Sequence, residues 1–349
     1  MSLLKNSTIV VAGIIISNLL AYVFHFVVGR ILGPADYGVF GALFAIFMIL
    51  TIPMSAISSG VSKFTARFVS KKEDSKIDSL LYKIFIGIIV YSLIIFVLAV
   101  VLRDFIANYI DVGPNTLIIL VAFSAIVSLF CSISRGYLQG IKSFGVYSCS
   151  LIFESTIRLV IVLLLFAIGF GAGGAIVAFG AGYFITFLAL IPFIKIKKAK
   201  KRINITGVYR FIFLVLVTNL LIHLLINAPT IFIKHYFSSE FTGLWTAALT
   251  IARISLFVTS AIALVMFPEV ASRENHKDKK QIFNKSFLLT LVSSVGIAIA
   301  FFLFGKFAIL LLYGSAYLPA VPILVGLGIA MIFLSLLQLW LNYWLAKRS

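Results

Sequence analysis

Residues 8–28 read TIVVAGIIISNLLAYVFHFVV, an apolar run of 21 residues without Asp, Glu, Lys or Arg. An α-helix needs about 20 such residues to cross the hydrocarbon core of a bilayer. The run is longer than the apolar part of a secretory signal peptide, and no small-residue cleavage site follows it. We therefore interpret it as the first of several membrane-spanning helices.

The rest of the chain has the same character. Of its 349 residues, 62% are hydrophobic and 11% are charged, whereas soluble domains are about 45–50% apolar and about 25% charged. A soluble fold could not bury so much apolar surface, which excludes a cytosolic enzyme, a disordered chain and a secreted disulfide scaffold. We expect an all-α polytopic membrane protein with about ten transmembrane helices, at residues 7–29, 37–62, 80–102, 114–138, 147–168, 174–194, 211–233, 243–270, 286–304 and 318–345.

The basic residues predict the orientation. The chain has 29 Lys and Arg against 11 Asp and Glu, a net charge of +18. Most of the Lys and Arg, Arg135 included, are assigned to every second loop, and the opposite loops hold only Arg30, Arg103, Lys234 and Lys306. This asymmetry predicts a cell-membrane protein with both termini in the cytoplasm. We expect the basic loops to face anionic lipid headgroups rather than nucleic acid, and Lys234 to snorkel towards the outer surface.

Two parts of the sequence resemble one another. Ser17-Asn18-Leu19-Leu20 matches Thr218-Asn219-Leu220-Leu221, and Gly38 and Gly243 follow at similar distances. Six predicted spans separate the two units, so they have the same orientation and form a parallel repeat. Chance similarity between leucine-rich segments is the alternative. The repeat predicts an N-terminal lobe of six helices (1–194), a basic cytoplasmic linker (195–210) and a C-terminal lobe of four (211–349).

Three motifs resemble a known family. Residues 29–38, GRILGPADYG, resemble the first outer turn of the polysaccharide-precursor flippases, in the multidrug, oligosaccharidyl-lipid and polysaccharide exporter superfamily. RGYLQG at 135–140, followed by Phe144, resembles the loop after that family's fourth helix, and the segment 236–268 resembles its seventh-to-eighth helix region. The resemblance implies a flippase that moves polyprenyl-diphosphate-linked oligosaccharides by alternating access between two lobes. Family members have twelve or fourteen helices, so the second lobe is expected to be two helices short.

Ionisable residues inside the spans are the main candidates for substrate binding, because a diphosphate in a low-dielectric region needs compensating positive charge. Arg253, in the eighth span, is the leading one, with a structural ion pair as the alternative. Glu154 and Arg158 lie at i and i+4 in the fifth span and share a helix face. They are interpreted either as a self-neutralising pair or as a gate in which substrate phosphate competes for Arg158.

Five polar residues complete the predicted site: Asn18, His25, Arg30, Asn219 and His223. The two histidines and two asparagines are placed in the two repeat units, as expected for cavity walls, although hydrogen bonding between helices is the commoner role of such residues. Arg30 lies at the outer end of the first span, where it could receive the emerging headgroup. The chain shows no catalytic, metal-binding or cofactor-binding motif, so we expect no enzyme activity, metal or cofactor.

Three alternatives compete with the flippase hypothesis. A multidrug exporter of the same superfamily would favour cationic drugs and would need more acidic residues in its cavity. A membrane-embedded glycan polymerase or ligase would need a larger outer loop. A non-transporting scaffold of a glycan-synthesis complex stays open, with other glycan-assembly membrane proteins as its partners.

Overall fold

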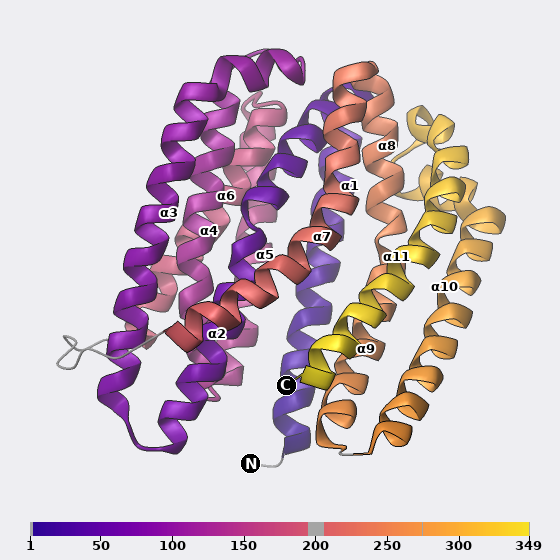
Figure 1. Cartoon of the computed structure of the whole chain (residues 1–349). Helices are drawn as coiled ribbons and strands as arrows, with labels where there is room; N and C mark the ends of the chain where they lie inside the picture. Colours follow the sequence, from indigo (N-terminus) through magenta and orange to yellow (C-terminus); the bar gives the residue numbers. More distant parts are fainter. Residues whose placement is uncertain (1–2, 195–205, 274, 349) are drawn as a thin grey trace. The chain divides into compact units, whose positions relative to one another are not determined.

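The computed structural model describes residues 3–194, 206–273 and 275–348 (Figure 1). Every secondary-structure element in these ranges is a helix. The helices form two compact units, here described each by itself: unit 1 is Met1–Leu32 with Val39–Ser238, and unit 2 is Gly33–Gly38 with Ser239–Ser349. Most of the predicted basic linker lies outside the described residues, and the predicted division into two lobes stays a prediction.

The helices differ in length and several contain breaks. Unit 1 holds α1 (Leu3–Leu50, apart from its turn at 33–38), α2 (Ile52–Ser70), α3 (Asp74–Tyr109), α4 (Thr116–Gly140), α5 (Phe144–Ala167), α6 (Ala172–Leu190), η1 (Ile191–Phe193) and α7 (Thr206–Tyr236). Unit 2 holds the turn 33–38, α8 (Ser239–Ala252), α9 (Ile254–Ser272), α10 (His276–Leu312), η2 (Ser315–Ala320) and α11 (Val321–Arg348).

Nine segments of the described chain are long and apolar enough to cross a membrane, which confirms the all-α polytopic fold class. The first segment, Thr8–Ser70, has 63 residues and as one straight helix would measure about 95 Å, three times the hydrocarbon thickness. It is not straight, because Gly33 has φ 70° and ψ 174° and Pro34 follows it. This segment therefore contains both the first and the second predicted spans.

Other helices differ from the predicted spans in instructive ways. α3 and α10 have 36 and 37 residues, more than the apolar stretches at 80–102 and 286–304. α10 begins in the basic loop, where the Asn275 side chain accepts a hydrogen bond from the Lys277 backbone N–H and caps the helix. The predicted eighth span, 243–270, is divided into α8 and α9 by a turn at Arg253.

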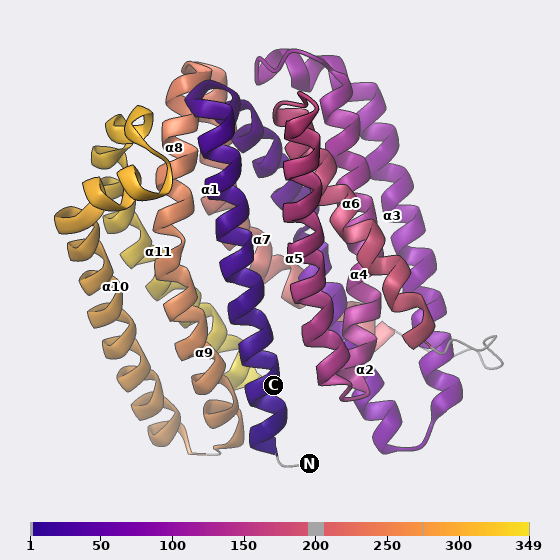
Figure 2. The same ribbon diagram turned by 180° about the vertical axis from the view of Figure 1, so that it is seen from behind.

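Unit 1 is built around α4, which packs against α2, α3 and α6, while α5 packs on α6 and α7 on α2. α1 runs beside α5 (Figure 2), with Gly13 against Ser148. The outward faces of α3 are apolar and exposed, for example at Leu93, Val101 and Phe105. Such surface is stable only against lipid or another apolar partner.

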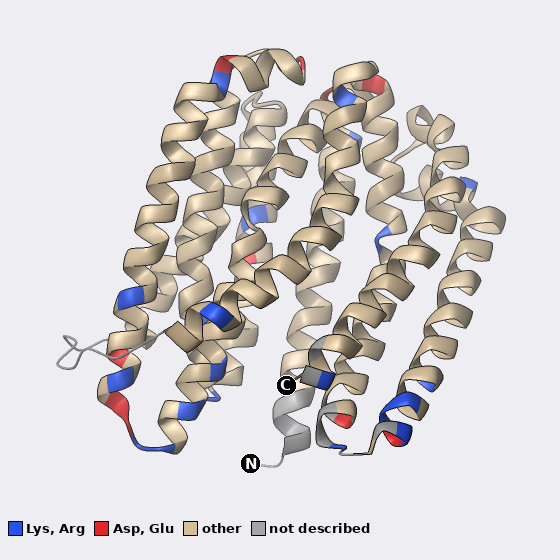
Figure 3. Cartoon of the chain, viewed as in Figure 1, with Lys and Arg blue, Asp and Glu red and all other residues tan. Residues whose placement is uncertain are grey.

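Unit 2 packs α9, α10 and α11 against one another and α8 against α11. Its core includes Met266, Val270 and Leu339. Within each unit, Lys and Arg gather near one end, around the α2–α3 turn of unit 1 and the α9–α10 turn of unit 2 (Figure 3). This clustering is what the alternation of basic loops in the sequence predicts for each unit.

The C-terminal end of α7 is fixed to the α3–α4 turn. Lys234 is 1% exposed, and its Nζ donates to the backbone carbonyl of Asp111 at 2.8 Å. The neighbouring His235 ring stacks on Tyr109 at 4.0 Å between centroids. The prediction that Lys234 snorkels to the surface is therefore wrong, because its ammonium group is used inside the protein.

Lys234→Met is expected to destabilise unit 1 by about 1.5–3 kcal/mol, because it keeps the apolar stem but removes a charged hydrogen-bond donor from a buried position. Thermal unfolding in detergent, followed by circular dichroism, measures the change. Lys76→Met is the matched control: Lys76 donates to Glu73 at 2.7 Å in a partly exposed pair, and the change should leave the melting temperature nearly unchanged. Equal melting temperatures for both variants would contradict the buried anchor.

Candidate functional site

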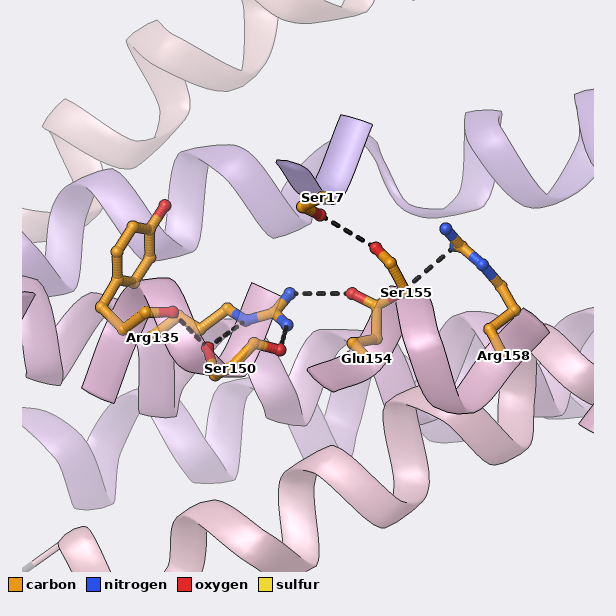
Figure 4. A network of polar contacts seen from close by, with 7 residues as sticks. Ser17, Arg135, Ser150, Glu154, Ser155 and Arg158 are labelled. Carbon is orange, nitrogen blue, oxygen red and sulfur yellow. Dashed lines mark hydrogen bonds and ion pairs between the residues drawn. The ribbon is translucent and has the colours of Figure 1, made fainter. Parts of the chain in front are cut away.

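Three charged side chains form a network inside unit 1 (Figure 4). The Glu154 carboxylate on α5 accepts from Arg158 Nη1, one turn further along the helix, at 3.2 Å and from Arg135 Nη1 on α4 at 3.2 Å. All three side chains are almost fully buried. Two guanidinium groups and one carboxylate leave a net charge of +1 in the interior of an apolar unit.

Arg135 is also held by α5. Its Nε donates to the Ser150 hydroxyl at 3.2 Å and its Nη2 to the Ser150 backbone carbonyl at 2.9 Å. A guanidinium has five N–H groups, and these two bonds with the one to Glu154 use three of them. The local geometry therefore fixes the orientation of Arg135 and leaves donors for a further partner.

Arg158 lies against aromatic rings. Its guanidinium carbon is 4.3 Å from the centre of the Phe179 ring on α6 and 5.2 Å from that of Phe24 on α1. Among the described residues its buried Nε has no hydrogen-bond partner. A buried donor without a partner is costly, and the cation–π contacts with the two rings offset part of this cost.

A cavity of about 400 Å³ lies beside the network within unit 1. Arg135 forms part of its wall, together with the hydroxyl groups of Thr51, Ser55 and Tyr183. The remaining lining residues are Phe47, Met48, Met54, Ser58, Ser59, Ser132, Gln139, Tyr147, Leu151 and His223. The cavity thus combines one cation with many neutral hydrogen-bonding groups and no carboxylate, a composition suited to an anionic, polar ligand.

Of the two predicted site residues on α7, one lines this cavity and the other binds a lining residue. His223 is part of its wall. Asn219, one turn earlier, donates from Nδ2 to the hydroxyl of Ser55 at 2.9 Å. α7 is therefore positioned on α2 so that His223 lines the cavity and Asn219 holds the Ser55 hydroxyl of its wall.

Two predicted residues of α1 lie along the same network. His25 is buried, with its ring 4.9 Å from Phe44 and 5.7 Å from Phe24, the ring that Arg158 also contacts. Asn18 is half-buried and follows Ser17, whose hydroxyl lies 2.9 Å from that of Ser155 on α5. Both residues therefore lie on the part of α1 that packs towards the network.

The other two predicted residues are elsewhere. Arg30 is exposed and precedes the break at Gly33 by three residues. Arg253 belongs to unit 2, where it is half-buried between α8 and α9. Neither residue is part of the unit 1 network, and their roles in substrate binding stay predictions.

Arg135 was not among the site residues predicted from the sequence. The charge pattern assigns it to the loop cations, but α4 continues to Gly140 and Arg135 is 4% exposed. A signal for its role exists in the sequence, because Arg135 lies inside the predicted span 114–138. The rule that an ionisable residue within a span indicates function, which selected Arg158 and Arg253, would have selected Arg135 too.

Comparison with known proteins places the chain among membrane proteins. A sequence model of the family described as "Polysaccharide biosynthesis protein" matches residues 27–322. An uncharacterised membrane protein of Methanocaldococcus jannaschii is 26% identical over 186 residues, which are 53% of this chain and 43% of that protein. The aligned part therefore spans less than half of the length of this relative.

Several solved transporter structures share the fold. An inward-facing multidrug resistance MATE family transporter of the MOP superfamily matches with a TM-score of 0.74 at 15% identity, covering 95% of this chain and 83% of that one. The lipid II flippase MurJ, in an inward closed conformation, matches with a TM-score of 0.74 at 14% identity, covering 97% and 76%. A MOP superfamily transporter from Pyrococcus furiosus matches with a TM-score of 0.61 at 14% identity, covering 99% and 84%.

Proposed function

Because this chain belongs to the family of polysaccharide biosynthesis proteins, we propose that it moves polyprenyl-diphosphate-linked oligosaccharide precursors across the cell membrane. The observation that carries the proposal is the buried Arg135–Glu154–Arg158 network beside the polar cavity of unit 1. Among solved proteins of the same fold, one is named a lipid II flippase, which supports a lipid-linked substrate.

The charge of the network supports an anionic substrate. A net positive charge in a membrane-embedded unit is energetically unfavourable unless a counter-charge compensates it. The diphosphate group of a lipid-linked sugar supplies such a charge, and guanidinium groups bind phosphate oxygens through paired N–H donors. The same charge disfavours cationic drugs, so the multidrug exporter is the weaker proposal.

In this proposal the gate differs from the one predicted from the sequence, because substrate phosphate competes for Arg135 rather than for Arg158. Arg135 is the network residue that forms part of the cavity wall, so phosphate oxygens would bind it first and compete with Glu154 for its N–H donors. Arg158 would then keep Glu154 neutralised. In this proposal Arg135 and His223 contact the substrate, and Arg158 and Glu154 set the net charge of the network. The two lobes alternate between cytoplasmic and outer access, and both termini lie in the cytoplasm.

Reconstituting the 349-residue chain in liposomes tests the proposal. A fluorescent polyprenyl-diphosphate saccharide is expected to become accessible to an external quencher faster than in protein-free liposomes. Unlabelled saccharide lipid should compete, whereas a lipophilic cationic dye should not. Folded protein that leaves the flipping rate at the protein-free value would contradict the proposal and favour the scaffold alternative.

A further inference from the structure

Unit 1 contains a second cavity, a groove of about 560 Å³ between α5 and α6. Ligand pockets are typically about 300–1,000 Å³ in volume. None of the residues that line the groove is charged, in contrast to the cavity at Arg135. Its walls include Val146, Cys149 and Phe153 on α5, with Ala189, Leu190 and Phe193 at the end of α6 and in η1. This composition favours a hydrocarbon chain over a polar ligand.

The α5 wall of the groove is about as long as one leaflet of a bilayer is thick. Gly145 and Phe153 are the first and last residues that α5 contributes to it. They are eight residues apart, so the wall extends about 12 Å along the helix. One half of the hydrocarbon core is about 15 Å thick. The groove therefore has the length of an acyl chain that stays within one leaflet.

A basic residue lies close to one end of the groove. Lys142 is exposed in the α4–α5 turn, three residues before Gly145. Its ammonium group forms no ion pair with any residue that the structure describes. Ser143, the residue before α5, makes no side-chain capping bond, so the first N–H groups of the helix keep donors for an outside acceptor. This end of the groove is therefore suited to a phosphate group.

The same end of unit 1 carries its other basic turn. α3 and α4 both have the length and hydropathy of a membrane span, and two crossings return the chain to the side from which it started. The α4–α5 turn therefore lies at the same end as the basic α2–α3 turn (Figure 3). Basic residues at this level are expected to lie beside anionic lipid headgroups.

Ser150 connects the groove to the charged network. It lines the groove, and both its hydroxyl and its backbone carbonyl accept hydrogen bonds from Arg135. The same hydroxyl donates to the Tyr147 carbonyl at 2.7 Å. Because these bonds are made within the protein, Ser150 needs no polar partner in the groove. An apolar chain there would pack against the residue that orients Arg135.

We propose that this groove binds one acyl chain of an anionic phospholipid, whose phosphate lies at Lys142 and the N-terminal end of α5. The acyl chain covers Ser150 on the groove side and so stabilises the part of α5 that holds Arg135. All of these residues belong to unit 1. The proposal does not depend on which substrate the chain moves.

The reactivity of Cys149 tests whether the groove is occupied. Cys149 is exposed and lines the groove, whereas Cys131 is buried. With delipidated protein in detergent, saturating dioleoyl phosphatidylglycerol should slow the reaction of Cys149 with N-ethylmaleimide at least about 10-fold. Phe105→Cys in a Cys149→Ala chain is the control, because Phe105 is exposed on α3 outside the groove, and its rate should not change. An unchanged rate at Cys149 would overturn the proposal.

Lys142→Gln tests the headgroup. The phosphatidylglycerol concentration that half-protects Cys149 should rise about 5-fold, as expected for the loss of one cation beside an anionic lipid. Lys72→Gln is the matched control, because Lys72 is also exposed and has a similar φ, 54° against 60° for Lys142. It should leave this concentration unchanged. Dioleoyl phosphatidylcholine, which has no net charge, should protect more weakly. Equal protection by both lipids, or in both variants, would exclude an anionic headgroup.

Ala189→Trp tests the position of the acyl chain, because an indole at this position fills the groove. In a Cys149→Ala chain, phosphatidylglycerol should raise the temperature at which the buried Cys131 reacts with a thiol dye, and Ala189→Trp should abolish this rise. Leu188→Trp is the control, since Leu188 is exposed on α6 outside the groove, and it should keep the rise. A rise that persists in Ala189→Trp would place the lipid elsewhere.

Polyprenyl diphosphate is the competing occupant, because it also combines phosphate with a hydrocarbon chain. It is added to the same Cys149 assay in place of phosphatidylglycerol. Protection by phosphatidylglycerol at lower concentration would support the phospholipid site. Protection by polyprenyl diphosphate alone would assign the groove to the substrate and overturn the proposal, while leaving the proposed function intact.

Discussion

Arg135→Met is expected to lower the flipping rate of a lipid-linked diphosphate saccharide about 100-fold without unfolding unit 1. Arg135 is the network residue at the cavity wall, so methionine removes the guanidinium that phosphate would meet first. A 100-fold loss corresponds to about 2.7 kcal/mol. This lies within the range of about 2–5 kcal/mol that truncating one partner of a buried, hydrogen-bonded charge pair costs.

The fold should survive because of the charge balance of the network. Without Arg135, Glu154 still pairs with Arg158 at 3.2 Å, and no charge is left unpaired. Methionine also fills most of the volume of the arginine stem. Arg103→Met is the control, since Arg103 is an exposed cation on α3 outside the network, and it should flip at the wild-type rate.

Glu154→Gln, unlike Arg135→Met, should lower the stability of unit 1. It leaves two buried guanidinium groups without a counter-charge, which is expected to destabilise unit 1 by about 3–5 kcal/mol. Cys131 is fully buried in unit 1, so its reaction with a thiol dye during heating, in a Cys149→Ala chain, reports the unfolding of this unit. Arg135→Met should melt above Glu154→Gln. A folded Arg135→Met protein with wild-type flipping would remove Arg135 from the substrate path.

Local patterns explain what the sequence could predict. The apolar runs are continuous in sequence, so they locate the spans, and the spacing of Glu154 and Arg158 is enough to place both on one face of a helix. The span rule could have selected Arg135, but its pairing with Glu154 could not be predicted, because the two residues lie on different helices and are 19 residues apart. Pairing between helices depends on their relative rotation, which hydropathy does not determine.

The positions of breaks within the helices were harder to predict than the helices themselves. Residues 243–270 form one continuous apolar run, yet a turn at Arg253 divides them.

The glycines of the two matched sequence motifs meet in unit 2. The turn 33–38 packs on the N-terminal end of α8, so that a Cβ on Gly38 would lie 2.8 Å from the backbone nitrogen of Gly243 and would overlap the carbonyl oxygen of Ser239. Tyr37 in the same turn is fully buried, with its hydroxyl 3.1 Å from that of Tyr313. Backbone therefore touches backbone at this point, and only glycine leaves the necessary space.

Gly243→Ala is expected to destabilise unit 2 by at least about 3 kcal/mol, at the upper end of the range for overpacking. Its Cβ would overlap the carbonyl oxygen of Pro34 and lie 2.7 Å from the Pro34 carbonyl carbon. Both are backbone atoms, which cannot rotate away as the end of a side chain can. To remove this overlap, the whole turn would have to move away from α8, and the buried Tyr37 would have to move with it.

Intrinsic fluorescence measures this effect selectively, because the three tryptophans, Trp245, Trp340 and Trp344, all belong to unit 2. Gly326→Ala is the matched control: a Cβ there meets open space on α11, and alanine should raise stability by up to about 1 kcal/mol through its helix propensity. The tryptophan transition should therefore fall for Gly243→Ala and stay or rise for Gly326→Ala. Equal transitions would mean that the turn can leave α8 without loss, and the turn would then be a loose connection rather than a fixed part of unit 2.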